Sequence, residues 1–460
     1  MRFLLCFCVT ILCLMNFILG VANGLALPEG PPHQPHTCVI GAGYSGLAAA
    51  RYLKEYGVHF TVYEAAKDIG GTWRFDPMVG TDEYGVPLFT SQYKYLRTNT
   101  PRQTMEFNGY TFPEDTPSYP SGTCFYKYLK SFAKEYGLMD NIQLNSYVTS
   151  VKWIGEWNHW NLTYTNSKNR NNYTDTCHFV IVANGQYVRA LVPEFQGLDT
   201  FRGKVLHSHD YKDPEHYRDR NVLLVGAGAS GLDLSTQLVN VTKKLVHSHH
   251  LVFNQPAYPD NYIKKPDIKG FVSNGVVFED GSFEEVDTAI LCTGYEFGQP
   301  FLDRSAGLTS SGKFLLPLHK NIVNIRHPSM TFIGVVNRVI TRVLDTQAHY
   351  AASLIAGKFK LPTQEDMLKM WLSHVYALKK MNLKITNVNL VVDMDKYFAD
   401  LSEEAGVTRA PPVLTEIRDF NAVNRLEDLL NYRDYDYKII DDYNYKRWYN
   451  PRNETCQIQV

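Results

Sequence analysis

The chain has 460 residues, of which 44% are hydrophobic and 20% are charged, and its formal net charge is −1 at pH 7. This length exceeds that of one simple core and indicates two or three domains. The near-neutral charge provides no overall field that would attract nucleic acid or an anionic membrane, so we expect neither as a partner.

The first 24 residues have the composition of a secretory signal peptide. Arg2 precedes a largely apolar run over residues 3–15, and small residues near position 24 offer a cleavage site. An uncleaved membrane anchor is the alternative, because the apolar stretch approaches the length that spans a bilayer. Asn16 and Asn23 interrupt the run and no basic cluster follows it, which favours cleavage and a secreted protein without a stable membrane anchor.

The eight cysteines do not form the pattern of a disulfide-stapled scaffold. Three lie in the leader, and Cys38 and Cys292 lie in apolar runs that are typical of buried strands. Cys124, Cys177 and Cys456 remain, so we expect at most one disulfide bond. Four N-x-S/T sequons agree with secretion, and they begin at Asn161, Asn172, Asn240 and Asn453.

A strand, glycine turn, helix and second strand are predicted over residues 37–64. An apolar run leads into Gly-x-Gly-x-x-Gly, and a helix-compatible segment leads to a second apolar run. In this context the pattern is the fingerprint of a dinucleotide site rather than a plain turn. The first glycine permits the tight turn, the second lets the backbone approach a pyrophosphate, and the third lets helix and strand pack closely. The turn consists of Gly41, Ala42, Gly43, Tyr44, Ser45 and Gly46.

The acid at the end of the second strand, Glu64, bears on which nucleotide binds. Its carboxylate can accept hydrogen bonds from ribose hydroxyls, which suits a nucleotide without a 2′-phosphate, so FAD and NAD both qualify. A second glycine-containing turn follows, where the chain can pass under the nucleotide and an indole can form an apolar wall. A core tryptophan beside a turn is the alternative. The residues of this turn are Gly71, Thr72 and Trp73.

Further strands are predicted from apolar patterns. Alternating apolar and polar residues over 147–164 indicate a half-exposed antiparallel hairpin. Continuous apolar runs at 178–183, 286–295 and 331–336 are typical of buried parallel strands.

A second strand, glycine turn and helix are predicted over residues 221–238, and two complete fingerprints indicate two nucleotides. No acid stands in the following strand where Glu64 stands in the first unit. Its absence, with Lys243 and Lys244 nearby, permits a 2′-phosphate, so the first site suits FAD and the second suits NADPH. The histidines at 247–250 lack a fourth ligand pattern, so surface histidines are favoured over a metal site and we expect no metal. The second turn consists of Gly226, Ala227, Gly228, Ala229, Ser230 and Gly231.

We therefore expect an α/β fold with two Rossmann-like nucleotide-binding domains, the second inserted into the first. The FAD-binding domain comprises residues 27–192 and 296–460, and the NADPH-binding domain comprises residues 193–295. No redox-active Cys-x-x-Cys pair is present, so an oxygenase, in which the cofactors carry the chemistry, is favoured over a disulfide-type flavin reductase.

Several motifs together resemble the flavin-containing monooxygenases. Besides the two glycine turns, they are residues 70–73, Thr293-Gly294-Tyr295, and the spaced motif Phe201, Gly203, His207, Ser208 and Tyr211. Related Baeyer–Villiger oxygenases have Trp where this chain has Tyr211, which favours N- and S-oxygenation. A secretory signal without a C-terminal anchor resembles the insect branch, which includes N-oxygenases of pyrrolizidine alkaloids.

The resemblance implies an FAD- and NADPH-dependent monooxygenase, secreted into a haemolymph-like fluid, that N-oxygenates tertiary amines such as pyrrolizidine alkaloids as detoxification. In the family, NADPH reduces FAD, O2 forms a C4a-hydroperoxyflavin, and a soft nucleophile takes its distal oxygen. Other soft nitrogen or sulfur nucleophiles are the alternative substrates, and a non-catalytic flavoprotein is the alternative of another class. The substrate and the oligomeric state, a homo-oligomer included, stay open.

The resemblance also assigns roles to single residues. Asn99 lies at the isoalloxazine as the catalytic residue, with a mere turn residue as the alternative. Gln347 either contacts the flavin or lies on a polar helix surface. Members commonly hold the 2′-phosphate with an arginine, where His249 or His250 stands in this chain, so the preference for NADPH over NADH stays open. The remaining cofactor contacts are Thr98, His207, Ser208, Thr293 and Gly294.

Overall fold

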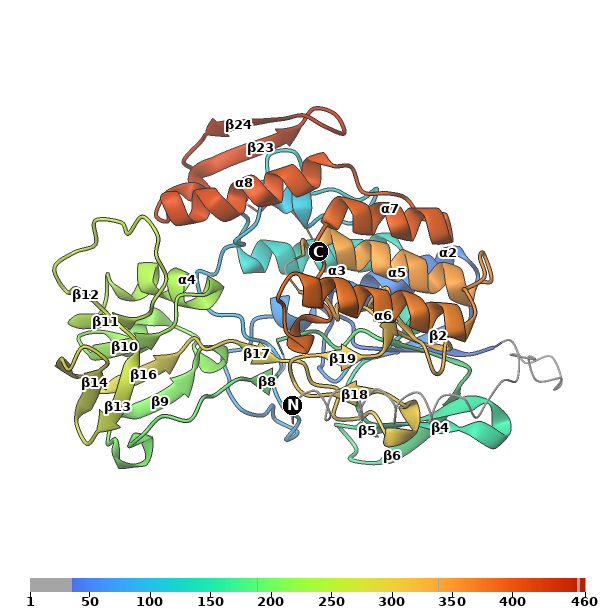
Figure 1. The fold of residues 1–460 in the computed structure, drawn as a ribbon, viewed down its shortest axis with the longest axis horizontal. Helices are drawn as coiled ribbons and strands as arrows, with labels where there is room; N and C mark the ends of the chain where they lie inside the picture. Colours follow the sequence, from blue (N-terminus) through green and yellow to red (C-terminus); the bar gives the residue numbers. More distant parts are fainter. Residues whose placement is uncertain (1–34, 188, 338, 453–455, 460) are drawn as a thin grey trace.

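The computed structural model describes residues 35–187, 189–337, 339–452 and 456–459, so the expected signal peptide lies outside the described residues. Two largely parallel sheets organise these residues (Figure 1). Strands of the larger sheet lie in the order β20 (Leu318–His319), β21 (Val323–Asn324), β22 (Met330–Phe332), β7 (Phe179–Val182), β1 (Thr37–Ile40), β2 (Phe60–Tyr63) and β3 (Ile142–Gln143). Only the β20–β21–β22 edge of this sheet is antiparallel.

The smaller sheet comes from one continuous segment of the chain. Its strands lie in the order β12 (Tyr262–Lys265), β11 (Lys244–Ser248), β10 (Asn221–Val225), β16 (Thr288–Leu291) and β9 (Lys204–His207), and all pairs are parallel. Strands β13 (Ile268–Val272), β14 (Gly275–Phe278) and β15 (Phe283–Glu285) form an antiparallel sheet within the same segment. The larger sheet takes strands from both sides of this segment, as expected for an insertion.

The chain enters and leaves the inserted segment through a short two-stranded ribbon. Here β8 (Arg189–Ala190) pairs antiparallel with β17 (Tyr295–Glu296). The two crossings therefore lie side by side. The structure has the predicted α/β architecture with two nucleotide-type units, while the domain boundaries at 192 and 295 stay a prediction.

The central strands of the larger sheet are buried on both faces. Val39 and Ile181 belong to the core cluster beneath the helices, whereas Cys38 and Val180 belong to the core cluster on the opposite face. This alternation follows from the two-residue period of a strand. It explains why the strands read as continuous apolar runs rather than as alternating ones.

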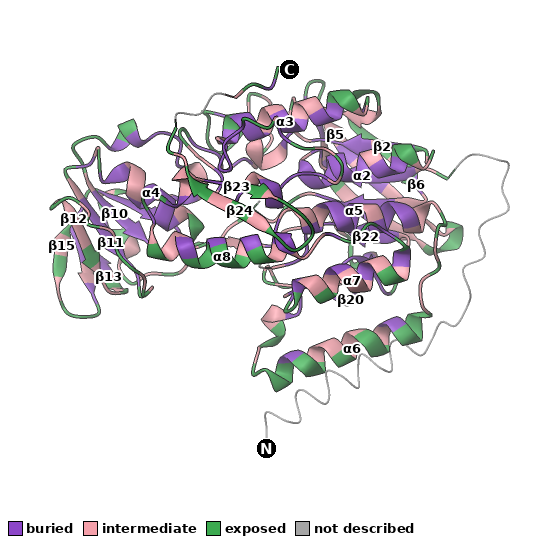
Figure 2. Cartoon of the chain, turned by 90° about the horizontal axis from the view of Figure 1, so that it is seen from above, coloured by how far each residue is buried: buried purple, intermediate pink, exposed green. Residues whose placement is uncertain are grey.

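Helices cover one face of this sheet. α2 (Tyr44–Glu55) packs on α5 (Arg342–Ile355), and the rings of Tyr52 and His349 stack with centroids 4.1 Å apart. Figure 2 shows α2 and α5 largely buried, whereas α6 (Gln364–Lys380) is mostly exposed at the periphery. α3 (Gly122–Glu135) and α7 (Met394–Ala405) complete this layer. None of the helices in the described ranges is long and apolar enough to cross a membrane.

An antiparallel sheet covers the opposite face. It consists of β4 (Ser146–Ile154), β5 (His159–Asn166) and β6 (Asn172–Cys177), which confirms the predicted hairpin over 147–164. The prediction of strand over 331–336 is wrong after Phe332, because Gly334 takes a φ of +93° and turns the chain. Strand β16 likewise ends before the predicted residue 295.

The C-terminal part of the chain returns to both units. α8 (Val413–Glu427) and the hairpin of β23 (Tyr435–Ile439) and β24 (Tyr445–Tyr449) lie between the two groups of elements along the top of Figure 1. A two-stranded ribbon of β18 (Thr309–Ser310) and β19 (Leu315–Leu316) precedes β20.

The expectation of at most one disulfide bond is wrong, because the described residues contain two. Cys38 is bonded to Cys177 and Cys124 to Cys456, with Cα–Cα distances of 5.7 and 5.5 Å. Cys38 does lie in a buried strand, as predicted, but its side chain points to the face where β6 ends at Cys177. Only Cys292 is a free cysteine in the described part of the chain.

Replacing Cys38 and Cys177 together by alanine is expected to lower the free energy of unfolding by about 2–5 kcal/mol, because the bond closes a loop of 139 residues in the unfolded chain. Urea denaturation measures this difference. Alkylation of the denatured, unreduced protein, read by mass spectrometry, should label Cys292 and leave the four bonded cysteines unlabelled. Labelling of Cys38 would contradict the pairing.

Candidate functional site

The first glycine turn connects β1 to α2 and is tightly built. The N–H of Gly41 donates to the carbonyl of Tyr63 at 2.8 Å, and Gly41 has a φ of +99°. A Cβ at Gly46 would lie 1.8 Å from the carbonyl oxygen of Gly41, so no side chain fits there. A Cβ at Gly43 would meet the protein no closer than 3.5 Å, at Gly71, so the protein itself does not require that glycine. The close approach of a pyrophosphate to the backbone at Gly43 stays a prediction, and this open space is compatible with it.

The carboxylate of Glu64 lies beside this turn. It accepts hydrogen bonds from the N–H of Ala42 at 2.6 Å and of Ala66 at 2.9 Å. Burial raises the pKa of the Glu64 carboxyl, and the two N–H groups act in the opposite direction. A carboxylate offers about four acceptor positions, so it retains capacity for ribose hydroxyls.

The turn of Gly71, Thr72 and Trp73 faces the first glycine turn. The N–H of Gly70 donates to the carbonyl of Ala42 at 3.0 Å. The indole of Trp73 is only half-buried and lies against Phe125, with ring centroids 4.2 Å apart. The structure therefore brings the two predicted halves of the first site together.

The segment that contains Asn99 is held by its backbone. Arg433 donates Nε to the carbonyl of Thr98 at 3.0 Å, and Asn421 donates Nδ2 to the carbonyl of Asn99 at 2.9 Å. The hydroxyl of Thr98 is buried without a hydrogen-bond partner. Asn99 is half-buried, and no hydrogen bond of its side-chain amide occurs among the described residues. The amide is therefore available to a ligand on a fixed backbone.

Arg433, in the short helix η10 (Tyr432–Asp434), also reaches the second nucleotide unit. Its guanidinium forms an ion pair with Asp233 of α4 (Ala229–Leu238) at 2.6 Å, and Asp233 also accepts from the hydroxyl of Tyr93 at 2.5 Å. Both charged side chains are nearly buried. The Asn99 segment and the helix of the second unit thus share one hydrogen-bonded anchor.

The second glycine turn has the same close backbone packing as the first, but its residues are more exposed to solvent. A Cβ at Gly231 would lie 1.9 Å from the carbonyl oxygen of Gly226, whereas a Cβ at Gly228 would meet nothing within 4 Å. Gly228 and Ala229 are exposed, whereas Ala42 and Ser45 of the first turn are buried. Ala227 and Ser230 are half-exposed beside them.

The other residues predicted for the second site lie at the same sheet edge. His207 ends β9 and pairs with Leu291, which pairs with Val225, the residue before the second turn. Thr293 and Gly294 follow Leu291 and therefore also lie at this edge. The Nε2 of His207 and the hydroxyl of Ser208 are buried without hydrogen-bond partners, a condition that fits a polar ligand.

Burial lowers the pKa of His207, and the nearby His209 acts in the same direction. His207 Nδ1 accepts from the N–H of His209 at 3.1 Å. The tautomer of His207 therefore carries its proton on Nε2, the free nitrogen, so that it can act as a donor.

The alternatives offered for Gln347 need correction. The residue lies on α5 but is fully buried, so it is not on a polar helix surface. Its Oε1 accepts from the N–H of Gly334 at 2.9 Å and its Nε2 donates to the hydroxyl of Tyr397 at 2.8 Å. Gly334 in turn lies close to the first glycine turn, because a Cβ built on Gly334 would lie 3.9 Å from the hydroxyl oxygen of Ser45. Gln347 thus fixes a loop beside the first turn, and direct flavin contact stays a prediction.

The lysines proposed near the second ribose also need correction. Lys243 and Lys244 lie at the amino end of β11, opposite the glycine turn, and Lys244 forms an ion pair with Glu284 at 3.0 Å. The carboxyl end of the neighbouring strand β12 carries Lys264 and Lys265 instead. Sequence patterns missed these residues because strand order cannot be read from a local motif.

The interpretation of the histidines at 247–250 as surface residues is wrong for His247 and His249, which are buried. Among the described residues, no group of three or more histidine, cysteine or acidic side chains is placed to hold a metal ion. His247 Nε2 donates to the carbonyl of Gly226 at 3.0 Å, and its Nδ1 accepts from the hydroxyl of Tyr262 at 2.9 Å. Burial lowers the pKa of His247 to about 3, so the ring is neutral and serves to hold the turn.

The two sites fit the two expected dinucleotides. At each turn the middle glycine, Gly43 or Gly228, has room for a side chain as far as the protein is concerned, so a close ligand fits there. At the second site, His207 Nε2 and the hydroxyl of Ser208 are also buried without hydrogen-bond partners. Within the described residues, the first site has an acid at the strand end and the second has none.

Comparison with known proteins identifies relatives that match most of the chain. The family model described as flavin-binding monooxygenase-like matches residues 35–252 and 260–418. Senecionine N-oxygenase of Tyria jacobaeae is 50% identical over 426 residues, which cover 91% of this chain and 93% of that protein. Trimethylamine monooxygenase of Pelagibacter ubique is 30% identical over 385 residues, 79% of this chain and 84% of that protein.

A solved structure has the same fold over most of its length. S-allyl-L-cysteine S-oxygenase of Allium sativum is 28% identical and superposes with a TM-score of 0.80. The match covers 87% of this chain and 95% of that one.

Gly228→Ala is expected to weaken binding of the second dinucleotide by about tenfold or more without lowering the melting temperature, because the new methyl group occupies ligand space only. Gly231→Ala is the matched control: it should destabilise the fold, since its Cβ would overlap the carbonyl of Gly226. Calorimetric titration and thermal denaturation separate the two effects. Equal loss of stability in both variants would contradict the assignment of Gly228.

Proposed function

The chain belongs to the flavin-binding monooxygenase-like family, and from this premise we propose that it N-oxygenates tertiary amines, with pyrrolizidine alkaloids such as senecionine as its substrate class. As a family member it is a flavin-dependent monooxygenase that binds FAD and NADP(H) and uses O2. The observation that carries the proposal is the 50% identity with senecionine N-oxygenase over 91% of the chain.

Bound FAD, reduced by NADPH, supplies the oxygen-activating chemistry, and the protein binds, orients and shields the reacting groups. The side-chain amide of Asn99 suits this task because its backbone is fixed by Asn421 and Arg433 while the amide itself is free. A donor that is already in place costs no reorganisation when charge develops. Exclusion of water matters because proton leakage releases hydrogen peroxide instead of product.

We also propose that the protein is exported and that the reaction serves detoxification. The composition of residues 1–24 and the two disulfide bonds support export, since disulfides persist in oxidising compartments. N-oxygenation converts a membrane-permeant base into a polar N-oxide, which crosses membranes poorly.

Sulfur oxygenation is the second candidate, and the likeness to S-allyl-L-cysteine S-oxygenase supports it. A thioether and a tertiary amine are both soft nucleophiles, so the cofactor chemistry does not distinguish them. A non-catalytic flavoprotein is disfavoured, because Gly43 and Gly228 are both retained although the protein fold does not require them.

Steady-state turnover on alkaloid free bases and thioethers tests the substrate class. We expect senecionine to stimulate NADPH consumption with one N-oxide formed per NADPH consumed, and thioethers to be oxidised with lower kcat/KM. Product is identified by mass spectrometry. A higher kcat/KM for thioethers would favour the second candidate, and stoichiometric peroxide with every substrate would contradict both.

Asn99→Ala is expected to raise the peroxide formed per N-oxide by about tenfold, the effect of losing one hydrogen bond of roughly 1.4 kcal/mol to the reacting groups. FAD content and NADPH affinity should change little, since Asn99 contributes no contact at either glycine turn. Asn171→Ala, on an exposed hairpin turn, is the matched control. Peroxide assays alongside product quantification measure the coupling, and unchanged coupling would refute the role of Asn99.

A further inference from the structure

The two nucleotide units have matching strand registers, and this match identifies the counterpart of Glu64. In the first unit Ile40 pairs with Tyr63, and Glu64 follows. In the second unit Val225 pairs with Ser248, and His249 follows. The N–H groups of Gly41 and Gly226 donate to Tyr63 and Ser248 at 2.8 and 2.9 Å, so the correspondence is the same on both sides of the turn. His249, and not His250, therefore occupies the position of the ribose-binding acid.

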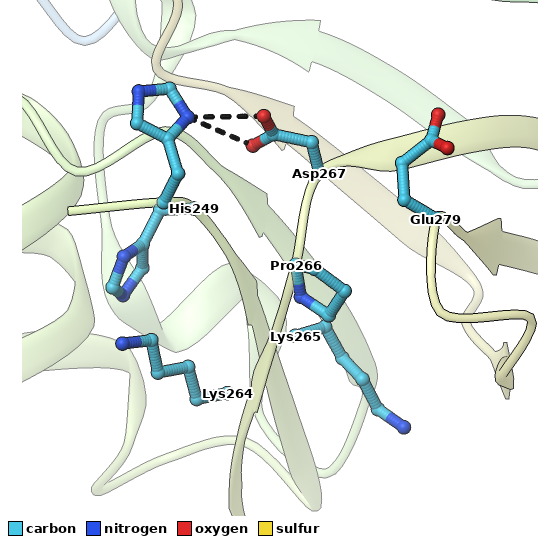
Figure 3. A pocket seen from close by; sticks show the side chains of 7 residues that line it. His249, Lys264, Lys265, Pro266, Asp267 and Glu279 are labelled. Carbon is cyan, nitrogen blue, oxygen red and sulfur yellow. Dashed lines mark hydrogen bonds and ion pairs between the residues drawn. The ribbon is translucent and has the colours of Figure 1, made fainter. Parts of the chain in front are cut away.

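His249 is buried at this position, and the hydrogen-bonding capacity of its ring is unused. Only 4% of the residue is exposed, and neither ring nitrogen has a hydrogen-bond partner. The ring packs edge-on against His247, which holds the carbonyl of Gly226, with centroids 4.5 Å apart. It lines a pocket of about 450 Å³ (Figure 3). A buried polar side chain without partners, next to a nucleotide turn, points to an absent ligand group.

Lys264 supplies an uncommitted cation to the same pocket. Its ammonium lies beside the His249 ring in Figure 3, and its one contact within the described residues is the carbonyl of Leu251 at 3.5 Å, the limit of a hydrogen bond. Lys265, by contrast, is bound to Glu284 and Ser282. Burial lowers the pKa of His249 to about 4, and the charge of Lys264 acts in the same direction. The His249 ring is therefore neutral near pH 7, and its single N–H can donate to an anion that the Lys264 ammonium also contacts.

The acids of the pocket lie away from this pair. Asp267 is bound by His250 at 3.0 Å, on the side of the pocket opposite Lys264 in Figure 3. Glu279 is exposed beyond Asp267. Neither carboxylate neutralises Lys264, so an anion at the His249 side meets one lysine and one imidazole.

We propose that His249 and Lys264 form the binding site of the 2′-phosphate, called the seat below, and that this site selects NADP(H) over NAD(H) in this chain. The phosphate oxygens accept from the ammonium of Lys264 and from an imidazole N–H of His249, in place of the ribose hydroxyls that Glu64 accepts from in the first unit. The cation comes from β12, adjacent to β11, rather than from β11 itself. The inference rests on the cofactor use of the family and not on the proposed substrate.

Binding to the oxidised flavoprotein tests this seat without turnover. The probes are 2′,5′-ADP and 5′-AMP, which differ only in the 2′-phosphate, followed by NADP⁺ and NAD⁺, all measured by isothermal titration calorimetry. Lys264→Met should weaken 2′,5′-ADP and NADP⁺ by about 10- to 100-fold, as expected for one charged hydrogen bond, and change 5′-AMP and NAD⁺ by less than about twofold. Lys264→Arg should restore most of the affinity.

Lys243→Met is the matched control, because it removes the same charge from the opposite end of β11 and should leave all four affinities unchanged. His249→Glu is the second variant. It recreates the acid of the first unit, so it should lose 2′,5′-ADP binding and retain 5′-AMP binding. Flavin content and melting temperature confirm that each variant is folded.

The outcomes separate this inference from the proposed function. Unchanged 2′,5′-ADP affinity in both Lys264→Met and His249→Glu, or an equal loss of 5′-AMP affinity, overturns the seat even if the enzyme oxygenates senecionine. Selective loss of the phosphorylated ligands supports the seat even if no alkaloid is a substrate.

Discussion

A nearly buried ion pair between Arg433 and Asp233 joins the segment of Thr98 and Asn99 to the second nucleotide unit. Two charges removed from water are tolerated only if each finds partners, and here Asp233 also accepts from Tyr93 while Arg433 also donates to the carbonyl of Thr98. Burial alone would lower the pKa of Arg433, but the charge of Asp233 holds it above its ordinary value. Because Asp233 lies on α4 and Thr98 precedes Asn99, the proposed catalytic amide and the second glycine turn cannot shift independently at low cost.

The two glycine turns differ in how far the chain covers them, and this difference matches the different roles of the two nucleotides. The first turn is largely buried, enclosed by the turn at Gly71 and Trp73, whereas the second is open at Gly228. A nucleotide enclosed by chain leaves slowly, which suits a cofactor that stays bound through many cycles. A nucleotide at an open turn can exchange in each cycle, which suits an electron donor that must be replaced after every hydride transfer.

The sequence predicts those parts of the molecule that depend on neighbouring residues. Both strand-turn-helix units, the hairpin over 147–164 and the buried strand over 178–183 follow from local periodicity and glycine spacing, and the structure contains all of them. Contacts between distant residues leave no such signal. The Cys38–Cys177 bond joins residues 139 apart, and Arg433 reaches Thr98 across 335 residues. The period of a strand shows that Cys38 faces one side of the sheet, but not that β6 ends there.

The limit of prediction at the second site has a physical origin. Pyrophosphate recognition uses backbone N–H groups and the absence of Cβ atoms, so it demands glycine at fixed spacing and is visible in any sequence. Discrimination at the ribose uses side chains from whichever strands lie side by side, and adjacency of β11 and β12 is a property of the folded sheet. Glu64 could be singled out from the sequence because it directly follows the second strand of its own strand-turn-helix-strand unit. His249 has a cationic neighbour in Lys264 of the next strand. The missing acid, which favours NADPH, could therefore be predicted from the sequence, whereas the neighbouring lysine could not.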